Sequence, residues 1–421
     1  MPLPDLVEIV APIRPDSGDW VIPGSKSITN RALILAALAR GPVRLLGALW
    51  SEDTEVMVDG LRCLGFEVTV EPDPEEPANR QIRVLGQGGR IPRGGTPDCP
   101  LELFVGNAGT AARFLAAMVC LGQGTYRLSG VPRMHERPQA ALLEALRSLG
   151  YAVQATGDRL PAVIQAAGPR PGRVQVSVDQ SSQFASALLL SGKVGGWTVE
   201  VTGADPEELP YVEMTRRLLE AFPHEGGDFE IEPDASSASY FWAATRLLGC
   251  PARIQHWPSS GWQVDAAFPK FLTLPQVVSR EKDLGDSIMT AMILAPFGNG
   301  PVRFTELGRL RVQECERVQA MRTELNRCGA RVEESGDSLT VWPGPLKGAT
   351  IGTYNDHRMA MCFATLGLKV PGIRLENPSC VKKTFPNFFQ KLVAPFPSGL
   401  GATVLDARSR QPLFGSELLP S

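Results

Sequence analysis

One pattern recurs three times along the chain and constrains the fold more than any other feature of the sequence. It is the frame Leu-x-x-x-Gly-x-x-Val, found at residues 61–68, 146–153 and 325–332. In each copy an amphipathic helix runs into a glycine, which can take the left-handed conformation that ends a helix, and an alternating apolar strand then begins. Many α/β proteins end helices in this way, so one copy says little. Three copies predict a repeated strand–helix unit.

The length of the chain calls for more than one core. Its 421 residues suit two domains of about 200 residues each. The best internal boundary lies at residues 230–239, where a strand over 229–231 ends at Pro233 and a helix begins around Asp234. Residues 86–100 and 169–172 are rich in Gly and Pro and are expected to be loops. The weak periodicity of residues 399–421 predicts a loosely packed tail.

Composition excludes several classes of protein. With 43% hydrophobic and 21% charged residues, the chain is typical of a soluble globular protein. Its net charge of -3 argues against a general nucleic-acid binder. The eight cysteines form no Cys-x-x-Cys pair and the four histidines show no metal-ligand spacing, so we expect free thiols and neither a metal nor a cofactor. Acids and prolines at residues 1–16, and apolar segments too short to span a bilayer, predict a cytoplasmic protein without a membrane partner.

Groups that suit anions recur at the starts of predicted helices. Residues 23–31 read PGSKSITNR, so a glycine turn, backbone N–H groups and the charges of Lys26 and Arg31 meet at one helix start. The second glycine of a Walker loop is missing. Residues 106–113 read GNAGTAAR and residues 181–184 read SSQF. Taken singly, each of these segments is better explained as a helix cap or a tight turn.

Charged motifs continue along the rest of the chain. Residues 133–138, RMHERP, place two arginines four apart, which suits a phosphate or carboxylate but equally an exposed Glu–Arg pair. Residues 311–317, RVQECER, contain Glu314 and Arg317, which alone would be an intrahelical ion pair. Asp286, after a glycine, reads from periodicity alone as a helix cap. Residues 382–386, KKTFP, would be an ordinary loop, whereas the polar run 354–361, YNDHRMAM, opens an apolar helix and favours a function.

In this order, the motifs resemble the enolpyruvyl transferase family of 5-enolpyruvylshikimate-3-phosphate synthases over nearly the whole chain. Residues 234–240, DASSASY, match as well, and PGSKSITNR and YNDHRMAM are the most specific segments. The resemblance implies an α/β (α+β) fold of two domains. Each would hold three βαβαββ-type units with parallel helices and a four-stranded sheet, an inverse α/β barrel. It further implies a discontinuous domain of residues 1–20 and 234–421, a second domain of residues 21–233, and an active site in the cleft between them.

The resemblance also implies an activity. The enolpyruvyl group of phosphoenolpyruvate would pass to the 5-hydroxyl of shikimate 3-phosphate, with release of phosphate, in the shikimate pathway of aromatic amino acid biosynthesis. The hydroxyl adds to C2 of phosphoenolpyruvate while C3 gains a proton, and phosphate then leaves as C3 loses one. One carboxylate must handle the hydroxyl proton and another the methylene carbon, which fits Asp286 and Glu314 respectively. Fixed cations stabilise the substrate anions. We expect a monomer without cofactors.

Matching positions assign the individual residues. The catalytic residues would be Asp286, Glu314 and Lys26. Shikimate 3-phosphate or the enolpyruvyl donor would contact Lys26, Ser27 and Arg31. The shikimate moiety and its phosphate would be held by Ser181, Ser182 and Gln183. Phosphoenolpyruvate would be surrounded by Gly109, Arg137, Arg317, Arg358 and Lys383. Tyr211 and Gln313 complete the expected substrate-binding set. Glyphosate would occupy the phosphoenolpyruvate site beside Gly109.

Some positions depart from the family pattern. Glu208 replaces the Ser that usually precedes x-Pro-Tyr and places an acid near an anion. Gln313 replaces the Lys before the catalytic Glu, so one cation is lost, while Arg309 stands at a position of Asn and offers a charge in return. Glu316 replaces Asp, and Gly285 replaces Pro.

Two alternatives stay open at this point. The related UDP-N-acetylglucosamine enolpyruvyl transferase typically has Asn after the first Lys and a catalytic Cys in a mobile loop. Here Ser27 follows Lys26, and residues 133–138 contain no Cys. A non-catalytic anion-binding protein on the same fold is the other alternative, and the presence of both Asp286 and Glu314 counts against it.

Overall fold

The chain divides into two compact units, each of which is described by itself. The computed structural model describes residues 3–203 and 209–420. Unit 1 consists of Met1–Pro23 and Pro233–Ser421, and unit 2 of Gly24–Glu232. These divisions lie close to the predicted ones after residues 20 and 233.

Unit 2 repeats one arrangement of helices and strands. Its strands β6, β7, β9 and β8 pair in that order, the first pair parallel and the other two antiparallel. Strands β12, β3, β5 and β4 form a second sheet with the same sequence of pairings. The strands are β3 (Pro42–Leu49), β4 (Val68–Pro72), β5 (Asn79–Leu85), β6 (Leu101–Phe104), β7 (Gln123–Ser129), β8 (Ala152–Ala155), β9 (Ala162–Ala167), β10 (Gly172–Ser177), β11 (Trp197–Thr202) and β12 (Gly227–Glu230). The helices are α1 (Lys26–Leu38), α2 (Glu52–Cys63), α3 (Gly109–Met118), α4 (Pro132–Glu136), α5 (Ala140–Ser148), α6 (Ser182–Gly195) and α7 (Leu209–Ala221).

Unit 1 uses the same arrangement. Strands β14, β15, β17 and β16 form one sheet, and β18, β19, β1 and β20 form another, each beginning with a parallel pair. The strands are β1 (Leu6–Val10), β2 (Gly18–Trp20), β13 (Ala252–Ile254), β14 (Val277–Ser279), β15 (Val302–Thr305), β16 (Arg331–Ser335), β17 (Ser338–Trp342), β18 (Thr350–Ile351), β19 (Arg374–Glu376) and β20 (Thr403–Asp406). The helices are α8 (Ala235–Leu248), α9 (Ile288–Leu294), α10 (Arg317–Arg327), α11 (His357–Gly367) and α12 (Phe388–Val393), with the 3₁₀ helices η3 (Val264–Phe271), η5 (Gly308–Val312) and η6 (Pro378–Lys383) among them.

The third sheet of each unit is smaller than predicted. Among the described residues it holds two parallel strands, β10 with β11 in unit 2 and β2 with β13 in unit 1. The expectation of a four-stranded sheet in every repeat is therefore wrong for these two. In unit 2 the strand that follows α7 is β12, and it pairs with β3 of another sheet. In unit 1 the chain after β13 runs on to η3 and forms no hairpin there.

The recurring glycine closes three outer helices in the same way. Gly65, Gly150 and Gly329 have φ angles of +90°, +88° and +88°. After α2, the Gly65 N–H donates to the Arg62 carbonyl and the Phe66 N–H to the Leu61 carbonyl, at 2.9 and 3.0 Å. The same two bonds follow α5 and α10. This is the Schellman arrangement, in which a left-handed residue satisfies the last helical carbonyls. The predicted helix ends are confirmed.

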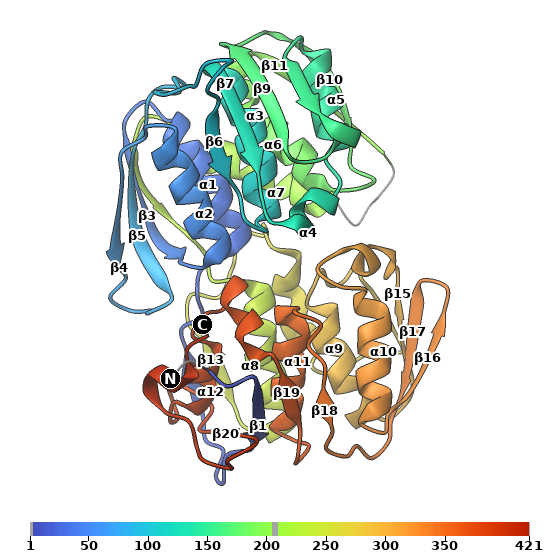
Figure 1. Ribbon diagram of the computed structural model, residues 1–421. Helices are drawn as coiled ribbons and strands as arrows, with labels where there is room; N and C mark the ends of the chain where they lie inside the picture. The colour runs from blue at the N-terminus through green and yellow to red at the C-terminus, as the bar shows by residue number, and fades with distance from the viewer. Residues whose placement is uncertain (1–2, 204–208, 421) are drawn as a thin grey trace. The chain divides into compact units, whose positions relative to one another are not determined.

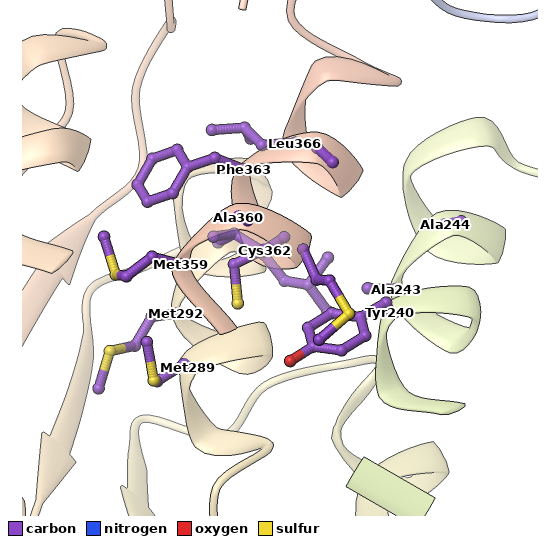
Figure 2. Close-up of a cluster of buried hydrophobic side chains, with 14 of the residues drawn as sticks. Tyr240, Ala243, Ala244, Met289, Met292, Met359, Ala360, Cys362, Phe363 and Leu366 are labelled. Atoms are coloured by element: carbon purple, nitrogen blue, oxygen red, sulfur yellow. The ribbon is translucent and has the colours of Figure 1, made fainter. Parts of the chain in front are cut away.

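The core of unit 1 is built from three helices that are buried almost all the way round. In α8, α9 and α11 most residues are inaccessible to solvent, and the sheets lie outside them (Figure 1). Figure 2 shows Met289 and Met292 of α9 close to Met359 and Cys362 of α11. Flexible thioethers fill irregular gaps between helices well. With helices inside and sheets outside, the unit matches the predicted inverse α/β barrel.

The C-terminal segment was predicted to be a loose tail, and that prediction is wrong. Strand β20 pairs antiparallel with β1, and Leu400, Val404 and Leu418 are buried. The Leu3 N–H also donates to the Leu419 carbonyl at 3.1 Å. A four-residue edge strand is too short for its periodicity to be recognised in the sequence. The two ends of the chain are therefore both part of unit 1.

The described residues bear on two further expectations. All eight cysteines are free thiols, as predicted. In the part of the chain that the structure describes, no helix combines the length and the apolar character needed to cross a membrane.

The left-handed glycines that end the outer helices lead to a prediction about stability. A Cβ at Gly329 would meet nothing closer than 3.8 Å, so Gly329→Ala isolates the backbone strain at φ +88°. We expect it to lower the free energy of unfolding by about 1–2 kcal/mol. Gly344→Ala is the matched control, because it has open space and no positive φ. Urea denaturation of both variants should find a loss for Gly329→Ala alone; equal stabilities would show that the left-handed end is not required.

Candidate active site

Asp286 stands among three guanidinium groups in unit 1. Its carboxylate oxygens lie 3.0 Å from Arg358 Nη2, 3.4 Å from Arg280 Nη2 and 3.7 Å from Arg317 Nη1. The predicted role as a helix cap is wrong, because the N-cap of α9 is Ser287. The hydroxyl and the N–H of Ser287 both donate to Asp265 instead, at 2.5 and 3.1 Å. The Asp286 carboxylate therefore faces the three arginines.

The surroundings of Asp286 decide its charge. Burial acts to raise the pKa of Asp286, but Arg358, Arg317 and Arg280 outweigh burial and hold that pKa below its ordinary value. Burial and the charge of Asp286 raise the pKa of Asp265, which accepts the hydrogen bonds of Ser287. At neutral pH Asp286 is thus an ionised carboxylate, which can accept a proton.

Glu314 lies between η5 and α10, held by two cations. Its Oε2 is 2.8 Å from Arg317 Nη2 and its Oε1 is 3.0 Å from Lys383 Nζ. The predicted intrahelical pair with Arg317 exists, although Glu314 precedes the helix that begins at Arg317. The same guanidinium therefore contacts both Glu314 and Asp286, which brings the two predicted catalytic carboxylates together.

A buried ion pair lies beneath these carboxylates. Arg317 Nε is 2.7 Å from Asp356 Oδ2, with side-chain exposures of 1% and 0%. Asp356 also accepts the Arg358 N–H at 2.8 Å as the N-cap of α11. Burial acts against the charge of Arg317, but Asp356, Glu314 and Asp286 raise the pKa of Arg317 above its ordinary value. Arg358 itself donates to Ser236 of α8.

Unit 2 carries three further groups of predicted residues. Lys26, at the start of α1, lies 3.0 Å from Asp53 in the first turn of α2. The Arg31 side chain is buried beneath and donates to Thr215, Ser186 and the carbonyl of Ser27, at 2.8, 3.1 and 2.9 Å. Its guanidinium also lies over the ring of Phe114. Arg31 therefore ties α1 to α6 and α7, while Lys26 and Ser27 are partly exposed.

The second group surrounds Gly109 at the start of α3. A Cβ at this glycine would lie 2.4 Å from Arg113 Nη1 and 2.8 Å from Arg137 Nη2. Arg113 donates to Gln183 Oε1 at 3.0 Å, and Arg137 to the carbonyl of Asn107 at 3.1 Å. The chain is thus folded so that two guanidinium groups approach a backbone position without a side chain. The other arginine of RMHERP, Arg133, pairs with Glu136 in solvent.

The third group opens α6. Ser181 caps the helix, and its hydroxyl accepts the Gln183 N–H at 3.2 Å. Ser182 is buried beside it, and Gln183 is partly exposed. The Tyr211 carbonyl accepts a hydrogen bond from the Thr215 hydroxyl at 2.9 Å and one from Arg31 Nη2 at 3.5 Å. Capping accounts for one serine, as predicted.

Three charged residues were missed by the sequence reasoning. Arg280 and Asp265 contact the Asp286 region, and Asp53 pairs with Lys26. None of them stands inside a recognised motif, and each meets its partner only through the fold. Among the described residues, no group of three or more His, Cys, Asp and Glu side chains is arranged to hold a metal ion.

Comparisons with known proteins place the chain in a family. The sequence model of "EPSP synthase (3-phosphoshikimate 1-carboxyvinyltransferase)" matches residues 10–225 and 277–392. The chain belongs to the EPSP synthase family. A 3-phosphoshikimate 1-carboxyvinyltransferase of Trichormus variabilis is 38% identical, over 92% of this chain and 98% of the relative. One of Rhizobium etli is 40% identical, over 92% of this chain and 96% of the relative. A solved EPSP synthase from Acinetobacter baumannii shares the fold, with a TM-score of 0.74 over 94% of this chain and 99% of that one, at 20% identity.

The departures from the EPSP synthase pattern acquire structural partners. Gln313, at the position of the usual Lys, accepts a hydrogen bond from Arg317 through its amide oxygen. Glu316 caps α10, where its carboxylate accepts the Gln319 N–H, and it also pairs with Arg311. Arg309 lies on η5, and its side chain is partly buried. Glu208 lies outside the described residues.

The buried ion pair of Arg317 with Asp356, next to Asp286 and Glu314, gives a prediction about stability. Asp356→Asn keeps a capping side chain but removes the charge that faces Arg317, and breaking a buried pair should cost about 3 kcal/mol. Asp234→Asn is the matched control, because Asp234 caps α8 and accepts the Ser237 N–H at 2.7 Å. We expect its cost to stay below about 1 kcal/mol. Urea denaturation measures both, and similar losses would mean that capping alone accounts for Asp356.

Proposed function

We propose that this chain transfers the enolpyruvyl group of phosphoenolpyruvate to the 5-hydroxyl of shikimate 3-phosphate and releases phosphate. The observation that carries the proposal is the cluster in unit 1, where Asp286 and Glu314 both contact Arg317 within reach of Arg358 and Lys383. Two carboxylates among fixed cations are what an addition–elimination on a doubly anionic substrate requires. Membership of the EPSP synthase family supports the same reaction.

The first step is the addition of the hydroxyl to C2 of phosphoenolpyruvate. Asp286 is ionised and takes the proton of the 5-hydroxyl as its oxygen attacks. The methylene carbon C3 gains a proton in the same step: the carboxyl group of Glu314 gives up that proton, and the electron pair of the C2–C3 double bond forms the new C–H bond. Lys383 Nζ lies 3.0 Å from Glu314 Oε1, so its ammonium group stabilises the carboxylate that this step leaves on Glu314.

The second step expels phosphate from the tetrahedral intermediate. C3 loses a proton to the Glu314 carboxylate, the C2–C3 double bond re-forms, and the C2–O bond to phosphate breaks, which leaves the enolpyruvyl product. The proton held by Asp286 accompanies the released phosphate, so both carboxyl groups return to their starting state. Arg317, Arg358 and Lys383 stabilise the anions of phosphoenolpyruvate throughout, because preorganised cations need no rearrangement when charge develops. The reaction then needs no metal, and the described residues supply both acid–base groups and cations.

Residues of unit 2 bind the rest of the substrates in this proposal. Ser181, Ser182 and Gln183 at the start of α6 hold the shikimate moiety and its phosphate. Lys26, Ser27 and Arg31 bind shikimate 3-phosphate or the donor. Tyr211 of unit 2 and Gln313 of unit 1 complete the set. Gly109 and Arg137 bind phosphoenolpyruvate. These assignments follow the family resemblance.

The test of the function is the release of phosphate from phosphoenolpyruvate by the purified protein. We expect release that depends on shikimate 3-phosphate and none that depends on UDP-N-acetylglucosamine. Release with the nucleotide sugar would favour the related transferase, although the names of the curated relatives favour the shikimate substrate. Binding of shikimate 3-phosphate without release would indicate a non-catalytic protein.

The acid–base assignment predicts a specific loss. Glu314→Gln and Asp286→Asn should each lower kcat by roughly 10²-fold or more, because each removes a group that transfers a proton. Both should still bind shikimate 3-phosphate, which isothermal titration calorimetry measures. Near-normal turnover in either variant would remove that residue from the mechanism.

Gly109 predicts the response to glyphosate. We expect glyphosate to inhibit the wild type in competition with phosphoenolpyruvate. Gly109→Ala should become resistant and bind phosphoenolpyruvate less well, because its methyl group would displace the ends of Arg113 and Arg137. The measurement is a glyphosate titration at several phosphoenolpyruvate concentrations.

A control separates the site from general effects of adding a methyl group. Gly300→Ala has nothing within 4 Å of the new Cβ and should behave as the wild type. Equal inhibition of the wild type and Gly109→Ala would show that this glycine does not shape the inhibitor site.

A further inference from the structure

The two carboxylate oxygens of Asp286 have different partners. Oδ1 faces Arg280 at 3.4 Å and Arg317 at 3.7 Å, whereas Oδ2 faces Arg358 at 3.0 Å. The side chains of Arg280 and Arg317 are 2% and 1% exposed, and those of Arg358 and Asp286 are 14% and 17% exposed. Oδ1 is thus held by the buried arginines and Oδ2 by the more accessible one.

The backbone that carries Arg280 is fixed. Its N–H donates to the Thr305 carbonyl at 3.2 Å, which continues the parallel pairing of β14 with β15 by one residue. The loop that follows is closed by the N–H groups of Asp283 and Leu284, which both donate to the Ser279 carbonyl, at 3.1 and 3.2 Å. The Ser279 N–H in turn donates to the Asp283 carboxylate at 2.8 Å. Arg280 therefore reaches Asp286 from a rigid strand end.

The other arginine on Oδ1 is shared among several acceptors. Arg317 contacts Asp356 at 2.7 Å and Glu314 at 2.8 Å, and it also donates to Gln313. Its longest contact is the one to Asp286. Arg280 is the closer of the two cations on Oδ1 and donates a hydrogen bond to it at 3.4 Å. Because a hydrogen bond is directional, Arg280 is the group that orients this oxygen.

We propose that Arg280 is a positioning residue that holds Oδ1 of Asp286 from the buried side and so presents Oδ2 to the substrate hydroxyl. The proposal rests on the function proposed above. When a substrate anion draws on Arg358, Oδ2 loses its partner and becomes able to accept a proton. Arg280 stays below and keeps the carboxylate both oriented and ionised until that moment.

The charge balance at Asp286 gives the sign of the test. The charged groups that face it are Arg280 from its own loop, Asp265 from η3, Glu314 from the segment before α10, Arg317 from the start of α10, and Arg358 from α11. When one cation is removed, the negative charges of Asp265 and Glu314 are balanced less well, so they disfavour the ionised form of Asp286 and its pKa rises. As the pH is lowered, a base that must be ionised for catalysis is then protonated at a higher pH than in the wild type, and activity is lost there.

The experiment compares Arg280→Met, Arg280→Lys and the wild type in the phosphate-release assay across pH. We expect Arg280→Met to lower kcat about 10-fold with KM for phosphoenolpyruvate nearly unchanged, as lost acid–base efficiency predicts. The acid limb of kcat/KM should move up by about one pH unit or more. Arg280→Lys restores the charge and should return the limb toward the wild type. Arg303→Met removes an exposed cation from β15 and should change neither quantity.

If the wild type releases no phosphate, that result overturns the proposed function but not the contact between Arg280 and Asp286. A second measurement therefore tests this contact by stability. Arg280→Met, Asp286→Asn and the double variant form a cycle in urea denaturation. We expect the two losses to be non-additive, because each variant removes the same contact. Additive losses, an unmoved acid limb in Arg280→Met, or an Arg280→Lys variant no better than Arg280→Met would each overturn the positioning role.

Discussion

The buried ion pair between Arg317 and Asp356 is the interaction on which the arrangement of unit 1 depends. Arg317 is the first residue of α10 and Asp356 the N-cap of α11, so one contact of 2.7 Å joins the starts of two helices. The remaining donors of the same guanidinium reach Glu314 and Asp286. Because an unpaired guanidinium at this depth would be costly, Arg317 must keep its carboxylate partners. The pairing that joins the two helices therefore also holds Glu314 and Asp286 in place.

This dependence explains why a neutral residue is tolerated beside Glu314. A lysine at position 313 would add a positive charge next to Arg317, and here Gln313 supplies an acceptor oxygen instead. The cluster then has one cation fewer, but Arg280 contributes a buried positive charge on another side. Both carboxylates thus keep cationic partners without a cation at position 313.

Local signals predicted the parts of the fold that local interactions build. The glycine after each outer helix was recognisable because its hydrogen bonds reach back only three to five residues, as at Gly65 and Phe66. Motif residues were recognisable because they cluster at helix starts. Arg280 and Asp53 were not, since each meets its partner only through tertiary structure. Periodicity alone predicted Asp286 to be a cap, because nothing in the sequence reveals that Ser287 is the N-cap of α9 and donates to Asp265.

The position of β1 has a consequence for synthesis of the chain on the ribosome. This strand lies between β19 and β20, so its two neighbours in the sheet come from the last fifty or so residues of the chain. Unit 2 is continuous from Gly24 to Glu232 and has all of its strands once that stretch has emerged. Because domains generally fold as units during synthesis, unit 2 is able to fold first. The N-terminal strand must wait, with its hydrogen-bonding edges uncovered, until nearly the whole protein has been made.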